Sequence, residues 1–449
     1  MIRRVLIANR GEIAARIIRT CKALGIETVL AASEADLDSV PARLADRVVC
    51  IGAAPPARSY LNVGAIVAAA EGAHCDAIHP GYGFLSENAA LGRACNDAGL
   101  IFIGATEEQL ASVGDKWRAR EIATRAGLPV VPGGMVDSAE AARTLIASIG
   151  CPALVKAVGG GGGRGMKRID HPAQAEETIA LAMAEADAAF GDARIYVERF
   201  VECGRHIEVQ LLGDGQTVIH LGDRDCSIQR RYQKLVEEAP APKLDARLRT
   251  RLHDSAVAYG KALSYRGLGT VEFLVDDARG EFFFLEMNAR IQVEHPVTEA
   301  ITGLDLVAEQ IAVAEGRPLR LSQDDVRFTG AAVEFRINAE DCAHDFRPSP
   351  GMVGAAEFPA GAGVRVDTHI EAGSIVPPFY DSLLAKIIVH GNDRPDALTH
   401  GKAALASCRI EGVHTNLAVH RAILDDAEFR AGGVATNWFG HFWPRAAPG

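Results

Sequence analysis

The sequence predicts an α/β protein with about three domains, and three observations lead to this prediction. The chain has 449 residues, whereas an average domain has roughly 150. Apolar residues make up 48% of the chain and charged residues 23%, which is typical of a globular protein and excludes intrinsic disorder. Strand and helix patterns alternate from the N-terminus, which indicates βαβ units and a mainly parallel sheet.

Charge, hydropathy and cysteine content exclude several classes of protein. The net charge of −11 disfavours polyanionic partners, so we expect neither nucleic-acid nor membrane binding. No apolar run approaches the ~18 residues of a membrane-spanning helix, and the apolar run after Arg4 is too short for a signal peptide. The nine cysteines are scattered singly without a CxxC pair, which predicts reduced thiols in a cytoplasmic protein rather than disulfides or a zinc site.

The first predicted domain covers residues 1–114. Apolar residues recur at helical spacing in Glu12–Leu24, which predicts an amphipathic helix after the first strand. The string HPGYGFLSEN at 79–88 follows a later strand, at the carboxyl end where open α/β sheets bind ligands. The stretches that predict strands are Val5–Ala8, Thr28–Ala31, Val48–Ile51, Asp76–Ile78 and Leu100–Ile103.

The second predicted domain, residues 115–330, contains an Ala-rich insertion at about 131–202 with a helix at Ile179–Ala189. Within the insertion a glycine run lies between the strand Ala153–Ala157 and the segment Met166–Ile169. Glycines let successive backbone N–H groups approach phosphate, and Lys156 and Arg164 add positive charge. A flexible linker is the alternative, but a linker would be Ser-rich. No GK[ST] follows, so the run is not a Walker A loop.

A hairpin predicts a metal site in the same domain. The strands Gly269–Val275 and Glu281–Asn288 flank the turn Asp276–Gly280, and antiparallel pairing brings Glu272 opposite Glu286, with Asn288 on the same face. Facing carboxylates repel unless a cation lies between them, and hard oxygen ligands suit Mg²⁺ or Mn²⁺. The alternative is a pair of solvated glutamates on an exposed edge.

Two further segments carry charge. Polar residues alternate with apolar ones in 286–294, so an extended chain would present Glu286, Asn288, Arg290, Gln292 and Glu294 in one row. A simple amphipathic strand is the alternative. The segment 224–234 contains four basic residues, which fit either an anion pocket or a surface patch neutralised by neighbouring glutamates.

The third predicted domain, residues 331–449, follows the polar connection Glu315–Gly330. Its strand Ala332–Asn338 places Glu334, Arg336 and Asn338 on one face, and a helix is predicted at Pro395–Ser407.

These motifs together resemble the biotin carboxylase family of ATP-grasp ligases, over nearly the whole chain and in the family's order. The matching strings are VLIANRGEIA at 5–14, HPGYGFLSEN at 79–88, GDK at 114–116, GGGGGRGM at 159–166, EEAPAP at 237–242, EMNARIQVEHPVTE at 286–299 and RINAED at 336–341. The resemblance implies a Rossmann-like N-terminal domain, an ATP-grasp domain with a mobile glycine-rich lid, and a C-terminal α+β domain. It also implies that ATP and bicarbonate give carboxyphosphate, which carboxylates biotin on a carrier protein, as in the first half-reaction of acetyl-CoA carboxylase.

The resemblance also assigns roles to residues by position. ATP contacts are expected from Lys116, Lys156, Gly162, Gly163, Glu198, Arg199, Phe200, Val201, His206, Tyr232, Glu272 and Glu286. The residues expected to hold bicarbonate are Lys234, Arg290, Gln292, Val293 and Glu294, with Glu294 as the general base. Glu272, Glu286 and Asn288 should bind two Mg²⁺ or Mn²⁺ ions, while Tyr82 and Arg336 should contact biotin. The catalytic set is therefore Lys234, Arg290, Glu294 and Arg336.

Two departures and one missing motif qualify this expectation. The family usually has Lys where Arg199 stands and His where Tyr232 stands, so the chain could serve another acyl-CoA carboxylase or a specialised one. No biotin-attachment sequence occurs, so we expect the carrier and the carboxyltransferase to be separate chains, and we expect a homodimer. Two alternatives stay open, namely another ATP-grasp ligase and a non-catalytic nucleotide-binding paralogue.

Overall fold

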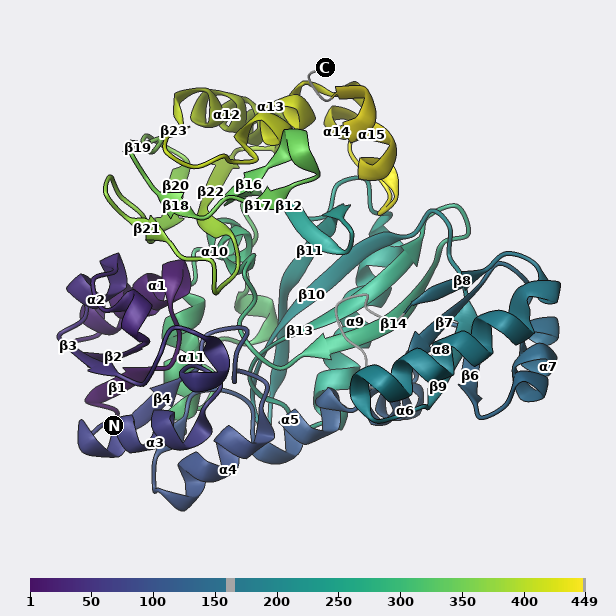
Figure 1. Ribbon diagram of the computed structural model, residues 1–449, viewed down its shortest axis with the longest axis horizontal. Helices are drawn as coiled ribbons and strands as arrows, with labels where there is room; N and C mark the ends of the chain where they lie inside the picture. The colour runs from purple at the N-terminus through teal and green to yellow at the C-terminus, as the bar shows by residue number, and fades with distance from the viewer. Residues whose placement is uncertain (159–165, 447–449) are drawn as a thin grey trace.

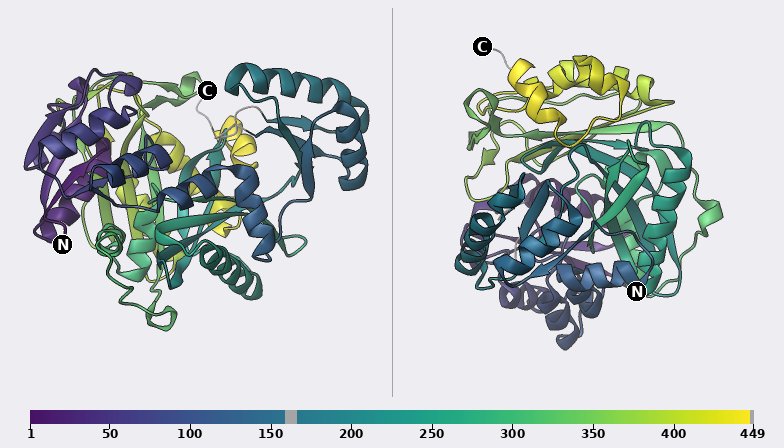
Figure 2. Two further views of the ribbon diagram at one scale, coloured as in Figure 1. Left: turned by 90° about the horizontal axis from the view of Figure 1, so that it is seen from below. Right: turned by 90° about the vertical axis from the view of Figure 1, so that its right-hand side faces the viewer.

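The computed structural model describes residues 1–158 and 166–446. Figure 1 shows three regions around a central sheet: the N-terminal section, a small projecting sheet with two helices, and the C-terminal section. The left view of Figure 2 shows the small sheet and its helices standing out from the rest of the molecule. The predicted α/β class is confirmed.

A five-stranded parallel sheet forms the N-terminal section, in the order β3-β2-β1-β4-β5. Side chains of its strands alternate between two cores. Leu6 packs with α3 and α4 on one face, whereas Val5 and Ile7 pack with α1 and α11 on the other. The elements of this section are β1 Arg4–Ile7, α1 Gly11–Ala23, β2 Glu27–Ala32, α2 Val40–Leu44, β3 Arg47–Cys50, α3 Val63–Gly72, β4 Ala77–His79, α4 Ala89–Asp97, β5 Ile101–Phe102 and α5 Glu107–Gly114.

An eight-stranded antiparallel sheet runs through the second and third sections, in the order β14-β13-β10-β11-β12-β15-β22-β20. The two predicted domains therefore share one sheet, which is joined where β12 pairs with β15. Its strands are β10 Arg205–Asp214, β11 Val218–Arg230, β12 Gln233–Ala239, β13 Arg266–Asp276, β14 Glu281–Asn288, β15 Ala331–Asn338, β20 Val364–Thr368 and β22 Leu383–Gly391.

Helices cover this sheet, and short polar residues fix where several of them begin. Asp115 accepts a hydrogen bond from the backbone of α6, which begins at Lys116. Asp245 and Asp305 cap α9 and α11 in the same way. The helices after α5 that lie outside the small projecting sheet are α6 Lys116–Arg125, α9 Ala246–Ala262, α10 His295–Thr302, α11 Leu306–Ala314, α12 Arg394–Ser407, α13 Leu417–Asp425, α14 Ala427–Ala431 and α15 Trp438–Ala446.

The Ala-rich insertion folds as a separate four-stranded sheet, in the order β6-β9-β7-β8, with two helices packed on it. Its elements are β6 Gly133–Val136, α7 Ala139–Ile149, β7 Ala153–Ala157, β8 Lys167–Ile169, α8 Ala175–Phe190 and β9 Ile195–Arg199. Strands β7 and β8 flank the glycine run, as predicted, and they pair antiparallel. Gly162, Gly163 and Arg164 lie outside the described residues.

Most predicted elements are confirmed to within a few residues, including the helices at Ile179–Ala189 and Pro395–Ser407. The remaining short elements are β16 Glu340–Asp341, β17 Arg347–Pro348, β18 Gly351–Met352, β19 Ala356–Glu357, β21 Ile375–Val376, β23 Arg409–Ile410 and the 3-10 turns Glu34–Asp36, Pro56–Arg58, Pro172–Gln174, Gln323–Asp325 and Cys342–His344. Among the described helices, none combines the length and the apolar character that crossing a membrane requires.

Candidate active site

A cavity of about 1620 Å³ lies between the central sheet, the small sheet and loops of the N- and C-terminal sections. Every predicted site residue in the described part of the chain lines it, although these residues come from segments far apart in the sequence. They are Tyr82, Lys116, Lys156, Glu198, Arg199, Phe200, Val201, His206, Tyr232, Lys234, Glu272, Glu286, Asn288, Arg290, Gln292, Val293, Glu294 and Arg336.

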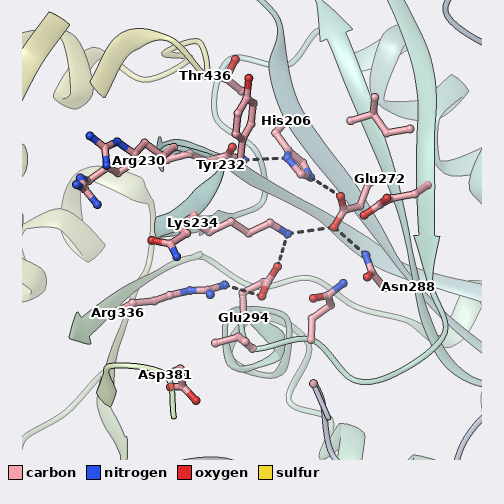
Figure 3. Close-up of a pocket in the computed structure, with 18 of the residues that line it drawn as sticks. His206, Arg230, Tyr232, Lys234, Glu272, Asn288, Glu294, Arg336, Asp381 and Thr436 are labelled. Atoms are coloured by element: carbon pink, nitrogen blue, oxygen red, sulfur yellow. Dashed lines mark hydrogen bonds and ion pairs between the residues drawn. The ribbon is translucent and has the colours of Figure 1, made fainter. Parts of the chain in front are cut away.

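Lys234 of β12 lies at the centre of the polar side chains (Figure 3). Its Nζ atom is 2.7 Å from a carboxylate oxygen of Glu208, 2.7 Å from one of Glu294 and 3.2 Å from one of Glu272. Burial lowers the pKa of Lys234, but Cys226 and the three carboxylates outweigh burial and raise that pKa well above its ordinary value. Lys234 is therefore a fixed positive charge between the two halves of the site.

Glu294 is fully buried, and two cations hold its carboxylate ionised. Besides Lys234, the guanidinium Nη2 of Arg336 lies 2.9 Å from it. Burial alone would raise the pKa of Glu294, but Lys234, Arg336 and Arg224 lower it well below the ordinary value. A carboxylate in this state can accept a proton at neutral pH from a group that enters the cavity.

The predicted pair of glutamates is confirmed, since Glu272 and Glu286 are direct partners across the β13–β14 hairpin. Glu272 also accepts a hydrogen bond of 2.8 Å from Asn288 and lies 3.0 Å from Nε2 of His206. Burial in the cleft and the charge of Glu272 raise the pKa of Glu286, which itself remains accessible from the cavity. A divalent cation between the two carboxylates would relieve this repulsion, so the donor set fits a metal.

The prediction of a single extended row over 286–294 is wrong. Strand β14 ends at Asn288, the chain turns, and α10 begins at His295 with Pro296 in its first turn. Proline fits this position because its missing N–H has no partner in the first turn of a helix. The turn nevertheless directs Arg290 and Gln292 into the cavity, where Arg290 Nη1 donates to Gln292 Oε1 at 3.1 Å.

The other end of the cavity is lined by side chains of the small sheet and of α6. Lys156 Nζ of β7 lies 2.5 Å from Glu198 Oε1 at the end of β9, and Lys116 begins α6. Arg199 forms an ion pair with Glu281 at 3.3 Å, and its guanidinium lies over the ring of Phe283. The side chain at position 199 therefore contacts the central sheet from the small sheet.

Neither sequence interpretation of the basic segment 224–234 fits Arg224, which is fully buried and bonded to Glu208 at 2.5 Å. Arg230 and Arg231 line the cavity, and they pair with Asp345 rather than with the neighbouring glutamates. Only Lys234, of these four basic residues, reaches the centre of the cavity. Arg224 and Arg230 lie six residues apart on β11, whose pairing with β12 is irregular between them, and Arg231 lies in the turn that joins the two strands.

Tyr232 lies in that turn and not on a strand, so it does not share a strand face with Lys234. Arg231 and Tyr232 have φ values of 48° and 67°, the left-handed values of a two-residue hairpin turn. The Tyr232 side chain is 61% exposed at the edge of the cavity.

We predict that Tyr232→His changes the KM for ATP by a modest factor and makes it pH-dependent between about 5.5 and 7.5, because histidine titrates there and tyrosine does not. Exposure at the cavity edge limits the effect, since water screens the new charge. Steady-state kinetics across this pH range checks the prediction. Identical ATP constants for both proteins at every pH would show that Tyr232 does not influence nucleotide binding.

Tyr82 and Arg336 lie on the side of the cavity formed by the N- and C-terminal sections. The Tyr82 hydroxyl donates to Glu12, which is buried at the start of α1. Arg336 of β15 lies between two buried carboxylates, at 2.6 Å from Glu237 and 2.9 Å from Glu294. Burial raises the pKa of Glu237 to about 7, with Arg336 opposing the rise.

Sequence reasoning missed several charged residues that support the site, above all Glu208, Glu237 and Glu12. Glu208 lies opposite Glu272 in the pairing of β10 with β13. The polar residues His206, Glu208 and Gln210 alternate in an otherwise apolar strand, and this pattern could have identified Glu208. Glu237 contacts Arg336 across neighbouring strands, a relation that no local pattern reveals.

Three family models match consecutive parts of the chain. The N-terminal domain of biotin carboxylase matches residues 1–110, the ATP binding domain of the carbamoyl-phosphate synthase L chain matches 115–322, and the C-terminal domain of biotin carboxylase matches 334–441. A biotin carboxylase of Nostoc sp. is 49% identical over 438 residues, which cover 97% of this chain and 98% of that relative. The chain belongs to the biotin carboxylase family. Like other biotin carboxylases, it is an ATP-dependent ligase.

Two further relatives carry the names of different enzymes. A pyruvate carboxylase subunit from Methanothermobacter thermautotrophicus is 46% identical over 442 residues, which cover 98% of this chain and 89% of the relative. A crystal structure of the biotin carboxylase domain dimer of Hydrogenobacter thermophilus 2-oxoglutarate carboxylase contains MgADP, ADP and bicarbonate. That structure has a TM-score of 0.95 and 43% identity, covering 99% of this chain and 98% of that one.

Proposed function

We propose that this chain carboxylates biotin on a separate carrier protein, using ATP, bicarbonate and two Mg²⁺ or Mn²⁺ ions. The observation that carries the proposal is one cavity in which the base Glu294 lies between two cations, beside the carboxylates Glu272 and Glu286. Another ATP-grasp ligase would share the carboxylate hairpin but not the Arg336 that the C-terminal section contributes.

Residues of the cavity perform the first step as follows. Lys234, Arg290, Gln292 and the backbone of Val293 hold bicarbonate next to Glu294, which takes its proton. A bicarbonate oxygen attacks the γ-phosphorus of ATP, and the bond from that phosphorus to the bridging oxygen of ADP breaks, giving carboxyphosphate and ADP. Fixed cations stabilise the charge that develops, because they need no reorganisation during the reaction.

ATP occupies the end of the cavity between the small sheet and the central sheet. Lys116, Lys156 and His206 contact its phosphates, and Glu198, Arg199, Phe200 and Val201 line the adenine pocket. Glu272, Glu286 and Asn288 would hold the metal ions, which neutralise the phosphate oxygens and orient them for in-line displacement when bound. The resemblance assigns contact with the phosphates to Gly162 and Gly163, which lie outside the described residues.

In the second step the bond between the carboxyl carbon and the phosphate oxygen of carboxyphosphate breaks, the carboxyl carbon bonds to N1 of biotin, and the proton of N1 leaves with the released phosphate. Arg336 stabilises the enolate oxygen of biotin, and Tyr82 lies close to the biotin ring. The likeness to the Nostoc biotin carboxylase supports biotin carboxylation, and the role in acetyl-CoA carboxylase is proposed from the length and motif order of the chain. The pyruvate and 2-oxoglutarate carboxylase relatives support the alternative that another carboxylase uses this chain. The dimer named for the Hydrogenobacter structure supports a homodimer. A separate carboxyltransferase and a cytoplasmic location complete the proposal.

The test is bicarbonate-dependent ATP hydrolysis by the purified chain, with free biotin added and omitted. We expect hydrolysis that requires bicarbonate and Mg²⁺, and faster turnover with biotin. Binding of ATP without any hydrolysis would instead support a non-catalytic paralogue. Hydrolysis that ignores bicarbonate would support another ATP-grasp ligase.

We predict that Arg336→Met reduces carboxylation of free biotin more than it reduces bicarbonate-dependent ATP cleavage. The side chain contacts the biotin side of the cavity, whereas phosphate and metal groups lie at the other end. Some ATP cleavage is also lost, because Arg336 lies 2.9 Å from the base Glu294. Parallel assays of carboxybiotin and ADP check the split, and equal loss of both products in a folded variant would contradict it.

A further inference from the structure

Lys386 of β22 is fully buried, yet it does not line the cavity. Its Nζ atom donates to the backbone carbonyl of Val293 at 2.8 Å and lies 3.1 Å from Oε2 of Glu12. A charged side chain is costly to bury unless hydrogen bonds and ion pairs compensate it. These two partners therefore determine where the ammonium group stays.

The two partners belong to opposite sides of the site. Val293 lies in the turn between β14 and α10 that carries Arg290, Gln292 and Glu294. Glu12 lies in the first turn of α1 in the N-terminal section and accepts a hydrogen bond from the Tyr82 hydroxyl. One buried ammonium thus connects the bicarbonate side of the cavity with the biotin side.

The sheet holds Lys386 in this position. Its neighbours across the strands are Arg336 of β15 and Asp367 of β20, so these three side chains share one face of the sheet. Asp367 is bonded mainly to Arg365 at 2.6 Å and lies 4.0 Å from Lys386. The carbonyl of Val293 and the carboxylate of Glu12 are therefore the near partners of the ammonium.

We propose that Lys386 is a positioning residue that fixes the turn carrying Gln292, Val293 and Glu294 and, through Glu12, the hydroxyl of Tyr82. This inference rests on the proposed function, because it assigns bicarbonate to that turn and biotin to Tyr82. The competing explanation is that Lys386 only neutralises the buried carboxylate of Glu12, since Asp367 is paired with Arg365 and burial raises the pKa of Glu334 well above its ordinary value.

The two explanations differ for a variant that removes both charges. Lys386→Met removes the hydrogen bond to Val293 and leaves Glu12 without its counter-charge. The double variant Glu12→Gln with Lys386→Met removes one negative and one positive charge, and the introduced amide can still accept the Tyr82 hydroxyl. Neutralisation alone predicts that the double variant recovers wild-type kinetics. Positioning predicts that its bicarbonate constant stays impaired.

The experiment measures steady-state constants of the full-length chain for bicarbonate, ATP and free biotin in the wild type, Lys386→Met, Glu12→Gln and the double variant. We expect a rise of about tenfold in the KM for bicarbonate in both proteins that lack Lys386, the loss typical of one charge-assisted hydrogen bond. The KM for ATP should be unchanged, and Glu12→Gln alone should raise only the KM for biotin.

Each outcome decides between the explanations. A wild-type bicarbonate constant in the double variant overturns the positioning role, and so does an equal loss of ATP and bicarbonate affinity. If Lys386→Met does not fold, the charge-balanced double variant supplies the measurement. Failure of the wild type to cleave ATP in response to bicarbonate would instead refute the proposed function, which keeps the two failures separate.

Discussion

We expect Glu294→Gln to lower bicarbonate-dependent ATP cleavage by about two to four orders of magnitude, the range that a positioned general base contributes. The substitution keeps the size of the side chain and one acceptor oxygen, but it removes the group that accepts the proton. It also removes the negative charge between Lys234 and Arg336, whose nitrogen atoms lie 2.7 and 2.9 Å from the carboxylate.

The control for this prediction is Glu237→Gln. Glu237 is equally buried and also contacts Arg336, at 2.6 Å, but it does not line the cavity. Its substitution should cost far less activity, because no substrate atom can reach it. Initial rates at saturating ATP and Mg²⁺ measure the difference. Similar losses in both variants would mean that Glu294 acts through the charge of Arg336 and not as the base.

Local patterns in the sequence predicted most of the secondary structure and the metal hairpin. Hydrophobic alternation and a turn signal determine strand pairing over short distances, so Glu272 and Glu286 were correctly predicted to face each other. The N-terminal strands pair parallel because a helix between two strands returns the chain to the same edge of the sheet, which the alternation of helix and strand patterns predicted.

The error over 286–294 arose because strand alternation was applied through a place where the chain turns, and the basic segment 224–234 also contains a turn. Strand β14 ends at Asn288, and the left-handed pair Arg231–Tyr232 separates β11 from β12. Neither break contains a glycine or a proline, so the usual turn signals are missing. Tertiary contacts decide these positions, including the pairing of Arg230 and Arg231 with Asp345.

Local sequence patterns could not predict which charged side chains form ion pairs in the site. Lys234 donates hydrogen bonds to Glu208 and Glu294, which lie 26 and 60 residues away in the sequence. Arg336 forms an ion pair with Glu237 because the pairing of β12 with β15 joins the second and third sections into one sheet. The resemblance to the biotin carboxylase family supplied roles for residues, but the contacts that hold these residues ionised come from the fold.

The second prediction with a large effect concerns the metal hairpin. We expect Glu286→Gln to lower metal-dependent ATP cleavage at fixed Mg²⁺ by at least about 10- to 100-fold. This is the loss typical when an outer partner of a metal ligand is removed. A direct oxygen ligand contributes more than its outer partners do, and an amide binds Mg²⁺ more weakly than a carboxylate. The variant should still fold, because the side chain at position 286 lines the cavity. Loss of its carboxylate also removes the repulsion with Glu272, which together with burial raises the pKa of Glu286.

A titration with Mg²⁺ distinguishes a metal ligand from a structural residue. For a ligand, the Mg²⁺ concentration that gives half-maximal rate should rise, and excess metal should recover part of the activity. Asp254→Asn, which removes one negative charge from the exposed surface of α9, is the matched control and should leave this concentration unchanged. If Glu286→Gln remains as active as the wild type at limiting Mg²⁺, the two carboxylates do not share a metal, because a lost ligand charge must weaken the binding of a divalent cation.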